Sequence, residues 1–178
     1  MEKRNQRVSI KITIICFLSA FLFACGYSFA PRGEHIDSRI QNIYVQPFGN
    51  KTAQAEIENY VRAAFINQFI QNSRFKIVNS EASADAVVKG EVVNLYTLSL
   101  SRKRNDLAAE ERATVVLEVT FQDSANGKVI WSAKNMKDSI DYTLDEDINM
   151  LPATRKQSLI KLSNDIAERA FNLMMSGF

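Results

Sequence analysis

The chain has 178 residues, which is enough for one domain and too short for two domains of ordinary size. Hydrophobic residues make up 46% and charged residues 24%, with only 6 glycines and 3 prolines, so the composition is globular and excludes disordered and collagen-like chains. A net charge of +2, two cysteines and one histidine exclude a chain dedicated to nucleic acid, a disulfide-rich scaffold and a histidine metal cluster.

The N-terminal segment has the pattern of a secretory signal. Its bases are Lys3, Arg4, Arg7 and Lys11, against the single acid Glu2. They are followed by the run Ile12–Ala24, which is apolar and carries no charge. A membrane-spanning helix needs about 20 apolar residues, so this run is short for one. Residues 1–24 are therefore predicted to be a signal peptide, and an uncleaved anchor helix is the alternative.

The signal ends in Leu22-Phe23-Ala24-Cys25, which resembles the lipobox of bacterial lipoproteins, although Phe23 is larger than usual at its position. The resemblance implies cleavage before Cys25, a diacylglycerol on its thiol and an N-acyl chain, such as palmitate, on its amine. Gly26 in place of aspartate implies export to the outer membrane. Removal of residues 1–24 takes away four bases and one acid, which turns the net charge from +2 to −1. A plain secreted protein with an unmodified cysteine is the alternative.

Residues 25–38 contain Gly, Pro and Ser without periodicity and are predicted to be a lipidated N-terminus and tether. A single domain over residues 39–178 is expected to follow. Its predicted elements are a strand over residues 39–48, a helix over 54–71 with Thr52 as a candidate cap, a short strand over 75–78, a strand over 85–100, a strand over 113–122, a strand over 128–133 with an extension toward Tyr142, and a helix over 152–175 with Pro152 in its first turn.

Two patterns predict how these elements pack. Residues 113–122 alternate between an apolar face and a largely polar one, which is typical of an antiparallel strand covered on one side only. Both helices carry one apolar stripe. We therefore expect a two-layer α+β sandwich, with two helices on one face of a mixed, mostly antiparallel sheet of four to five strands in the order β-α-β-β-β-β-α. Asn126-Gly127 predicts a type I′ hairpin, and Gly90 predicts a bulge or bend.

Residue types for catalysis are scarce. His35 is the single histidine and lies in the predicted tether, where a Ser-His-Asp triad has no rigid support. No Gly-rich phosphate loop opens a helix. The acid runs Glu110-Glu111 and Asp145-Glu146-Asp147 are interpreted as solvated acids, with weak calcium binding as the alternative. The chain is therefore predicted not to be an enzyme, and to hold no metal or non-covalent cofactor.

Two surface features are candidates for binding. Arg102, Lys103 and Arg104 form a basic cluster that is either a solvated hairpin tip or a contact for a lipid phosphate. Lys134 and Lys137 are weaker candidates to join this cluster across the sheet. The polar face of residues 113–122 is either ordinary solvated surface or a surface that fits a wet, polar cavity; its polar members are Thr114, Glu118, Thr120 and Gln122.

The order of several landmarks resembles the lipopolysaccharide-assembly lipoprotein family, LptE. The landmarks are Cys25-Gly26-Tyr27, the run from Ile43 to Phe48 with Asn50-Lys51-Thr52, Ile57-Glu58, Phe75-Lys76-Ile77-Val78, the run from Ala84 to Gly90, Gly127-Lys128-Val129-Ile130-Trp131, and the run from Leu162 to Ala167. The resemblance implies two helices on a four-stranded sheet. It also implies a place at the outer membrane, either in the lumen of the β-barrel LptD or on its periplasmic side, where the lipoprotein assists barrel assembly and lipopolysaccharide transport.

Within that resemblance, Arg102, Lys103, Arg104 and Lys134 are the candidate contacts for lipopolysaccharide, and Cys25 is the lipidation site. The expected partners are LptD, lipopolysaccharide and the outer membrane, and no nucleic acid. Two other hypotheses remain open: an accessory lipoprotein of another envelope secretion or assembly machine with the same fold, and a lipid-anchored hydrolase that depends on His35.

Overall fold

A computed structural model of the chain describes residues 36–178 except 73, 103–107, 145–146, 148 and 178. The predicted signal peptide, Cys25, most of the tether and His35 lie outside the described residues. Ile36 and Ile40 are 3% and 1% exposed and belong to the hydrophobic core. The packed part of the chain therefore includes Ile36, which the sequence pattern assigned to the tether.

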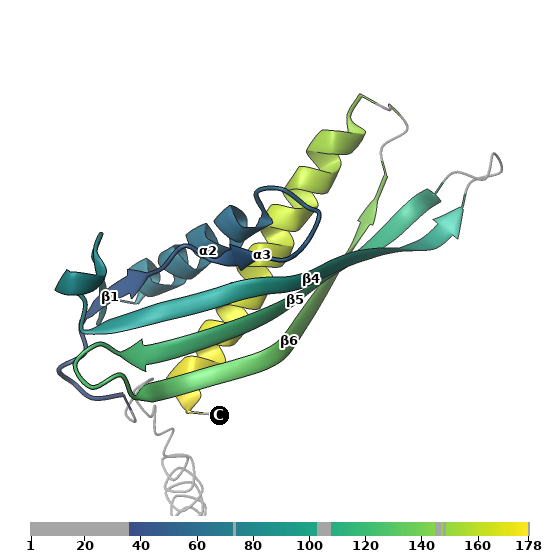
Figure 1. Cartoon of the computed structure of the whole chain (residues 1–178). Helices are drawn as coiled ribbons and strands as arrows, with labels where there is room; N and C mark the ends of the chain where they lie inside the picture. The colour runs from purple at the N-terminus through teal and green to yellow at the C-terminus, as the bar shows by residue number, and fades with distance from the viewer. Residues whose placement is uncertain (1–35, 73, 103–107, 145–146, 148, 178) are drawn as a thin grey trace, which may run out of the picture. The chain divides into compact units, whose positions relative to one another are not determined.

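Six strands form one mixed sheet in the order β3-β1-β4-β5-β6, with β2 beside β4 (Figure 1). The strands are β1 Asn42–Val45, β2 Gly49–Asn50, β3 Lys76–Ile77, β4 Ala86–Arg102, β5 Ala108–Asp123 and β6 Val129–Thr143. Strand β1 runs parallel to both β3 and β4, and β2 is parallel to β4. Strands β4, β5 and β6 are successive antiparallel neighbours. The long antiparallel part of the sheet is thus β4–β6.

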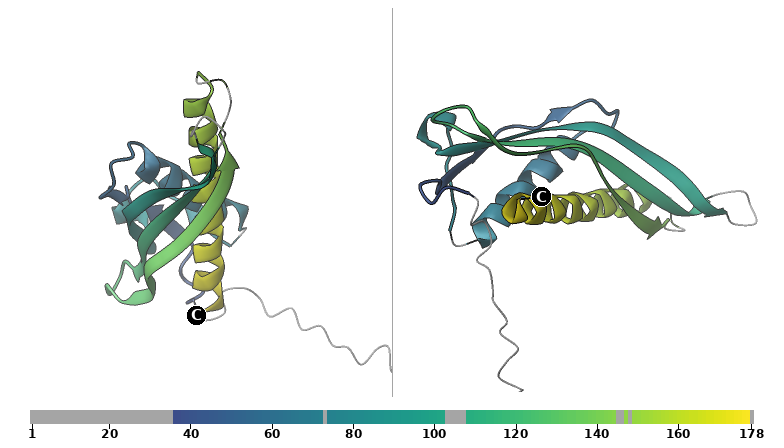
Figure 2. Two further views of the ribbon diagram at one scale, coloured as in Figure 1. Left: turned by 90° about the vertical axis from the view of Figure 1, so that its right-hand side faces the viewer. Right: turned by 90° about the horizontal axis from the view of Figure 1, so that it is seen from below.

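The helices α2 (Ile57–Gln71) and α3 (Leu151–Ser176) pack on the same face of this sheet (Figure 2). A short 3-10 helix, η1 (Glu81–Ser83), precedes β4. Pro152 lies in the first turn of α3, as predicted. Thr52 does not cap α2, because the residue before the helix is Glu56, with a φ of 67°. The Thr52 hydroxyl instead accepts a hydrogen bond from the N–H of Gln54, at 3.1 Å.

The core lies between the helices and the inward face of the sheet. The β5 residues that the alternation assigned to the apolar face are all buried: Ala113, Val115, Leu117, Val119 and Phe121. Phe69 of α2 is 0% exposed, and its ring lies 5.1 Å from that of Phe171 in α3 and 6.1 Å from that of Phe121. The predicted two-layer α+β sandwich and its element order are confirmed, with β2 as a short additional strand.

Two local predictions in β4 and β5 were wrong. Strand β5 begins at Ala108 and not at residue 113, and Glu110, Glu111 and Arg112 already pair with β6; Arg112, for example, binds Asp141. Gly90 pairs in regular register with Val119 and marks no bulge. The space that its Cβ would fill is taken by the ring of Phe48, whose Cε1 atom would lie 2.2 Å away. A glycine is therefore needed there for a close approach.

The hairpin between β5 and β6 is present but is not a type I′ turn. Gly127 has a φ of 69°, whereas Asn126 is not among the residues with positive φ. The loop is held by Asp123, whose carboxylate accepts hydrogen bonds from the N–H of Ala125 at 2.8 Å and from the side-chain amide of Asn126 at 3.2 Å. The sequence pattern missed this role because a buried aspartate before the loop changes the turn that Asn-Gly would form alone.

Candidate functional site: the outward face of the sheet

The face of β4–β6 that points away from the helices is called the outward face here. Cross-strand pairing arranges its side chains in rows. In β5 it presents Thr114, Val116, Glu118, Thr120 and Gln122, the set that the alternation predicted. No helix of the described chain covers this face, so it is available to a partner.

The outward face is only partly exposed to solvent. Glu118, Thr120 and Gln122 are partly exposed, but Thr114 and Val116 are only 7% and 5% exposed. The prediction that Thr114 is a solvated member of this face was therefore wrong. The longer side chain of Tyr96 in β4 shares the row of Thr114, whose hydroxyl lies 2.9 Å from that of Ser139 in β6.

Some charges on this face are paired with opposite charges. Glu91 and Glu118 lie directly opposite each other, and Lys51 binds Glu91 at 2.6 Å. The pKa of Lys51 is raised by its hydrogen bond and charge attraction to Glu91, with a further contribution from Glu118. This lysine therefore reduces a repulsion that two opposed carboxylates would otherwise create.

A second pair crosses from β5 to β6. The Arg112 guanidinium donates two hydrogen bonds to Asp141, at 2.6 and 2.7 Å. These bonds hold the pKa of Asp141 below its usual value and raise that of Arg112. The sequence pattern missed this pair because both residues lay in stretches with no clear alternation, and only the register brings them together.

A bulge in β6 displays Lys134. Between the pairs Leu117–Met136 and Val119–Ala133, β6 places Lys134 and Asn135 opposite the single residue Glu118. Asn135 has a φ of 55°, which an asparagine adopts more readily than most residues. Both residues are exposed. The bulge therefore turns a lysine out of the regular sheet surface.

The structure does not place Lys134 beside Arg102, the one residue of the predicted basic cluster whose backbone it describes. Arg102 ends β4 opposite Ala108, whereas Lys134 lies opposite Glu118. These two positions in β5 are ten residues apart, or roughly 33 Å along the strand. Lys137 is exposed and pairs with Val116, nearer to Lys134 than to Arg102. Lys103, Arg104 and the side chain of Arg102 lie outside the described part of the chain.

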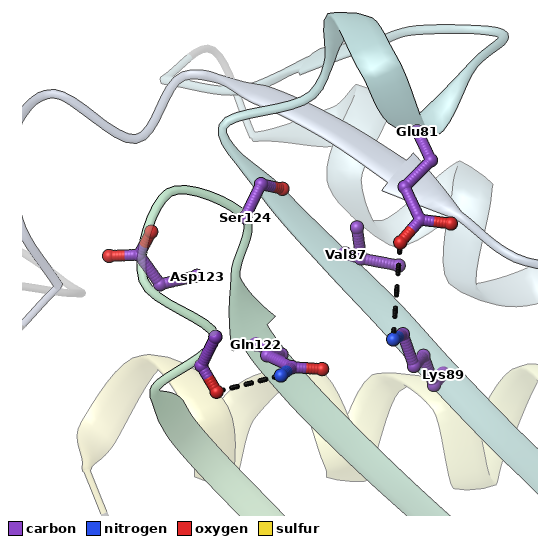
Figure 3. Close-up of a pocket in the computed structure, with 7 residues that line it drawn as sticks. Glu81, Val87, Lys89, Gln122, Asp123 and Ser124 are labelled. Atoms are coloured by element: carbon purple, nitrogen blue, oxygen red, sulfur yellow. Dashed lines mark hydrogen bonds and ion pairs between the residues drawn. The ribbon is translucent and has the colours of Figure 1, made fainter.

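Beside the β5–β6 hairpin is a small open pocket of about 80 Å³ (Figure 3). It is lined by Glu81, Val87, Lys89, Gln122, Asp123, Ser124 and Gly127. Lys89 faces Glu81 at 4.0 Å, and Gln122 donates to the carbonyl of Gly127 at 2.7 Å. Burial would raise the pKa of Asp123, but hydrogen bonds from Ala125 and from Arg39 outweigh it and lower that pKa. The Asp123 and Gln122 contacts therefore stabilise the hairpin.

The described residues contain no cluster of His, Cys, Asp and Glu able to hold a metal ion. Nor does any described helix have the length and apolar character required to span a bilayer. A row of exposed apolar residues, which the sequence analysis did not single out, lies on β4: Tyr96, Leu98 and Leu100. Their period of two was a signal that could have revealed them.

Comparison with known proteins connects this fold to one family. The family model described as LptE, lipopolysaccharide-assembly, matches residues 40–174. No curated protein matches the sequence. Among solved structures, an uncharacterized lipoprotein B from Nitrosomonas europaea is 13% identical with a TM-score of 0.53, covering 85% of this chain and 91% of its own. A protein from Xanthomonas campestris is 9% identical with a TM-score of 0.50, covering 78% and 85%. At these identities the structural likeness shows the fold alone.

Proposed function

Because this chain belongs to the LptE family of lipopolysaccharide-assembly lipoproteins, a non-catalytic family associated with the outer membrane, we propose that it docks in the lumen of the β-barrel LptD. In this role it assists the assembly of the barrel and takes part in the transport of lipopolysaccharide to the outer leaflet. The family match is the observation that carries the proposal.

The outward face supports a docking role. Wide membrane barrels have polar, water-filled interiors. The outward face offers polar side chains, and several of its charges are paired, as in Glu91 with Lys51 and Arg112 with Asp141. Docking in a water-filled lumen does not require these pairs to be broken. A surface of this kind recognises its partner by shape and hydrogen bonding rather than by strong net charge.

The proposed anchor is Cys25, with residues 1–24 removed as a signal peptide, residues 25–38 as the lipidated N-terminus and tether, and residues 39–178 as one domain. A diacylglycerol and an N-acyl chain bury many CH₂ groups at about 0.8 kcal/mol each, which makes anchoring stable where one chain is marginal. The acyl chains hold the domain at the inner surface of the outer membrane, where it meets the barrel.

The anchor is tested by mass analysis of the membrane-extracted protein. We expect an N-terminus that starts at Cys25 and carries the added acyl mass. Cys25→Ser removes both the acyl mass and retention in the membrane. Cys16→Ser is the matched control, because it removes the other cysteine of the chain and leaves the lipobox intact. An unacylated N-terminus contradicts the proposed anchor.

Barrel docking is tested by affinity purification of the full chain from detergent-solubilised outer membranes. We expect LptD to be recovered with it. Recovery of a secretin or a curli-type pore in its place indicates an accessory role in another envelope machine, and recovery without any barrel protein ends the proposal. The His35→Ala variant tests the hydrolase hypothesis. A hydrolase that depends on His35 loses its activity with this change, whereas a docking protein still recovers the barrel.

Contact with lipopolysaccharide is proposed at Arg102, Lys103 and Arg104, and separately at Lys134. Arginine and lysine side chains suit the phosphates of the lipid head group. Alanine substitution of the three adjacent bases is expected to lower the amount of lipopolysaccharide that co-purifies several-fold, and Lys134→Ala to lower it less. Lys161→Ala on α3 is the control, because this exposed lysine already pairs with Asp165 at 2.9 Å. Equal retention by all variants contradicts the proposed contacts.

A further inference from the structure

The second half of β4 is an open sheet edge within the described chain. On one side of β4, β5 pairs with it as far as Arg102. On the other side, β1 pairs with residues up to Val88, and β2 ends at the pair of Asn50 with Val92. No described strand pairs with residues 94–102 on this side. This end of β4 also extends past α2 (Figure 1). The nine residues 94–102 are called the open edge here.

The backbone of the open edge is oriented for strand pairing. The carbonyl oxygen of Val92 accepts from the N–H of Lys51, at 2.9 Å, so the backbone groups of Val92 point away from β5. Val92 pairs with Leu117, and every second residue of an antiparallel strand has the same orientation. The same orientation therefore holds for the β4 residues that pair with Val115, Ala113 and Glu111. These are Leu95, Thr97 and Ser99, and their N–H and C=O groups point toward the free side.

Apart from Arg102 at its end, the open edge lacks the usual protection against pairing. Natural edge strands are blocked by charges, by proline or by a covering element. The run from Val92 to Ser101 contains neither a charged residue nor a proline. Instead Tyr96, Leu98 and Leu100 are 47%, 59% and 40% exposed. Tyr96 and Leu98 share the outward face, opposite Thr114 and Arg112. An extended apolar edge of this kind is stable in a native protein when another strand covers it.

We propose that the open edge receives an extended segment of the barrel partner, which adds one strand to the sheet and places apolar side chains against Tyr96 and Leu98. This inference rests on the proposed function and names the surface by which the partner is held. An uncharged partner segment with apolar residues at alternate positions complements an edge with the same pattern.

The size of the open edge favours such a segment over a second copy of the chain. A stable dimer buries about 20–30 residues on each side. The open edge supplies nine residues, which is the length of one added strand. Lipid is a poor occupant, because acyl chains offer no hydrogen-bonding groups to the exposed N–H and C=O groups.

Two substitutions in the full chain test the proposal through recovery of the barrel from detergent-solubilised membranes. Leu98→Lys places a charge on the edge, and Thr97→Pro removes an N–H that faces the free side without taking a bond from the β4–β5 ladder. Each is expected to lower barrel recovery about tenfold. Ile70→Lys is the matched control, because Ile70 is 61% exposed on α2, outside both the open edge and the outward face. It is expected to recover the barrel as the wild type does.

A photo-reactive phenylalanine analogue at position 98 gives a second readout that does not depend on the stability of a variant. The expected product is a cross-link to an extended segment of the barrel protein. A cross-link to a second copy, or to lipid alone, overturns the proposal. So does a normal yield of barrel with both Leu98→Lys and Thr97→Pro, in which case the proposed function stands and only the docking edge is wrong. If the wild type recovers no barrel, the proposed function fails and this inference with it.

Discussion

The contact between Gly90 and Phe48 allows a sharp test of the packing. A Cβ at position 90 would lie 2.2 Å from Cε1 and 2.7 Å from Cδ1 of Phe48. Carbon atoms in contact prefer about 3.5–4.0 Å, so the ring would have to move by roughly 1.5 Å. It has little room, because it is 6% exposed and its centroid lies 5.3 Å from that of Phe65 in α2. Overpacking of this kind costs about 1–3 kcal/mol.

Alanine also recovers about 0.5–1 kcal/mol relative to glycine in a strand, so Gly90→Ala is expected to lower the free energy of unfolding by about 1–2 kcal/mol. In a Phe48→Ala background the clash is absent, and the same change is expected to be neutral or stabilising. The assay is urea denaturation of all four proteins, followed by the fluorescence of Trp131, the single tryptophan and 8% exposed. An equal effect of Gly90→Ala in both backgrounds would refute the assigned contact, because the coupling between the two positions would be zero.

Three further predictions follow from the core and the ionised groups. Phe69→Ala, at a 0% exposed site with three aromatic neighbours, is expected to cost about 3–5 kcal/mol of unfolding free energy in the same urea assay. The lowered pKa of Asp123 gives stability that is present above the ordinary aspartate pKa of about 4 and is lost as the pH falls through the lower folded value. Asp123→Asn should therefore lower the free energy of unfolding at pH 7 and reduce its fall at acid pH. An unchanged loss of stability at acid pH argues against the role of Asp123 in the hairpin loop. Burial and the hydrogen bond to Glu111 raise the pKa of Tyr142 to about 12, so the difference between the absorbance titrations of the wild type and Tyr142→Phe should show a tyrosine that ionises near that pH.

The regular parts of the fold were predictable from local pattern. The alternation in residues 113–122 identified the buried face of β5, because a period of two has one structural explanation when one face is apolar. Pro152 and the spacing of Leu159, Leu162 and Ile166 located α3 for the same kind of reason. The order of elements then followed from how two apolar stripes and one half-covered sheet can bury each other.

Features that depend on long-range register were not predictable in this way. The two hydrogen bonds that Arg112 donates to Asp141 join residues 29 positions apart, and only the β5–β6 pairing aligns them. The role of Gly90 depends on a ring from position 48, which no local rule around the glycine contains. The open edge can be identified only when the end of β2 relative to β4 is known. Local rules describe elements, whereas these properties belong to pairs of elements.

The most direct test of the central claim is depletion of the protein in cells that make it. A docking lipoprotein that assists a barrel should be needed for the folded barrel itself. We predict that depletion converts LptD from its folded, heat-modifiable form to an unfolded one on gels, and that lipopolysaccharide at the cell surface falls with it. Folded LptD and surface lipopolysaccharide that both remain at wild-type levels after depletion would contradict the account.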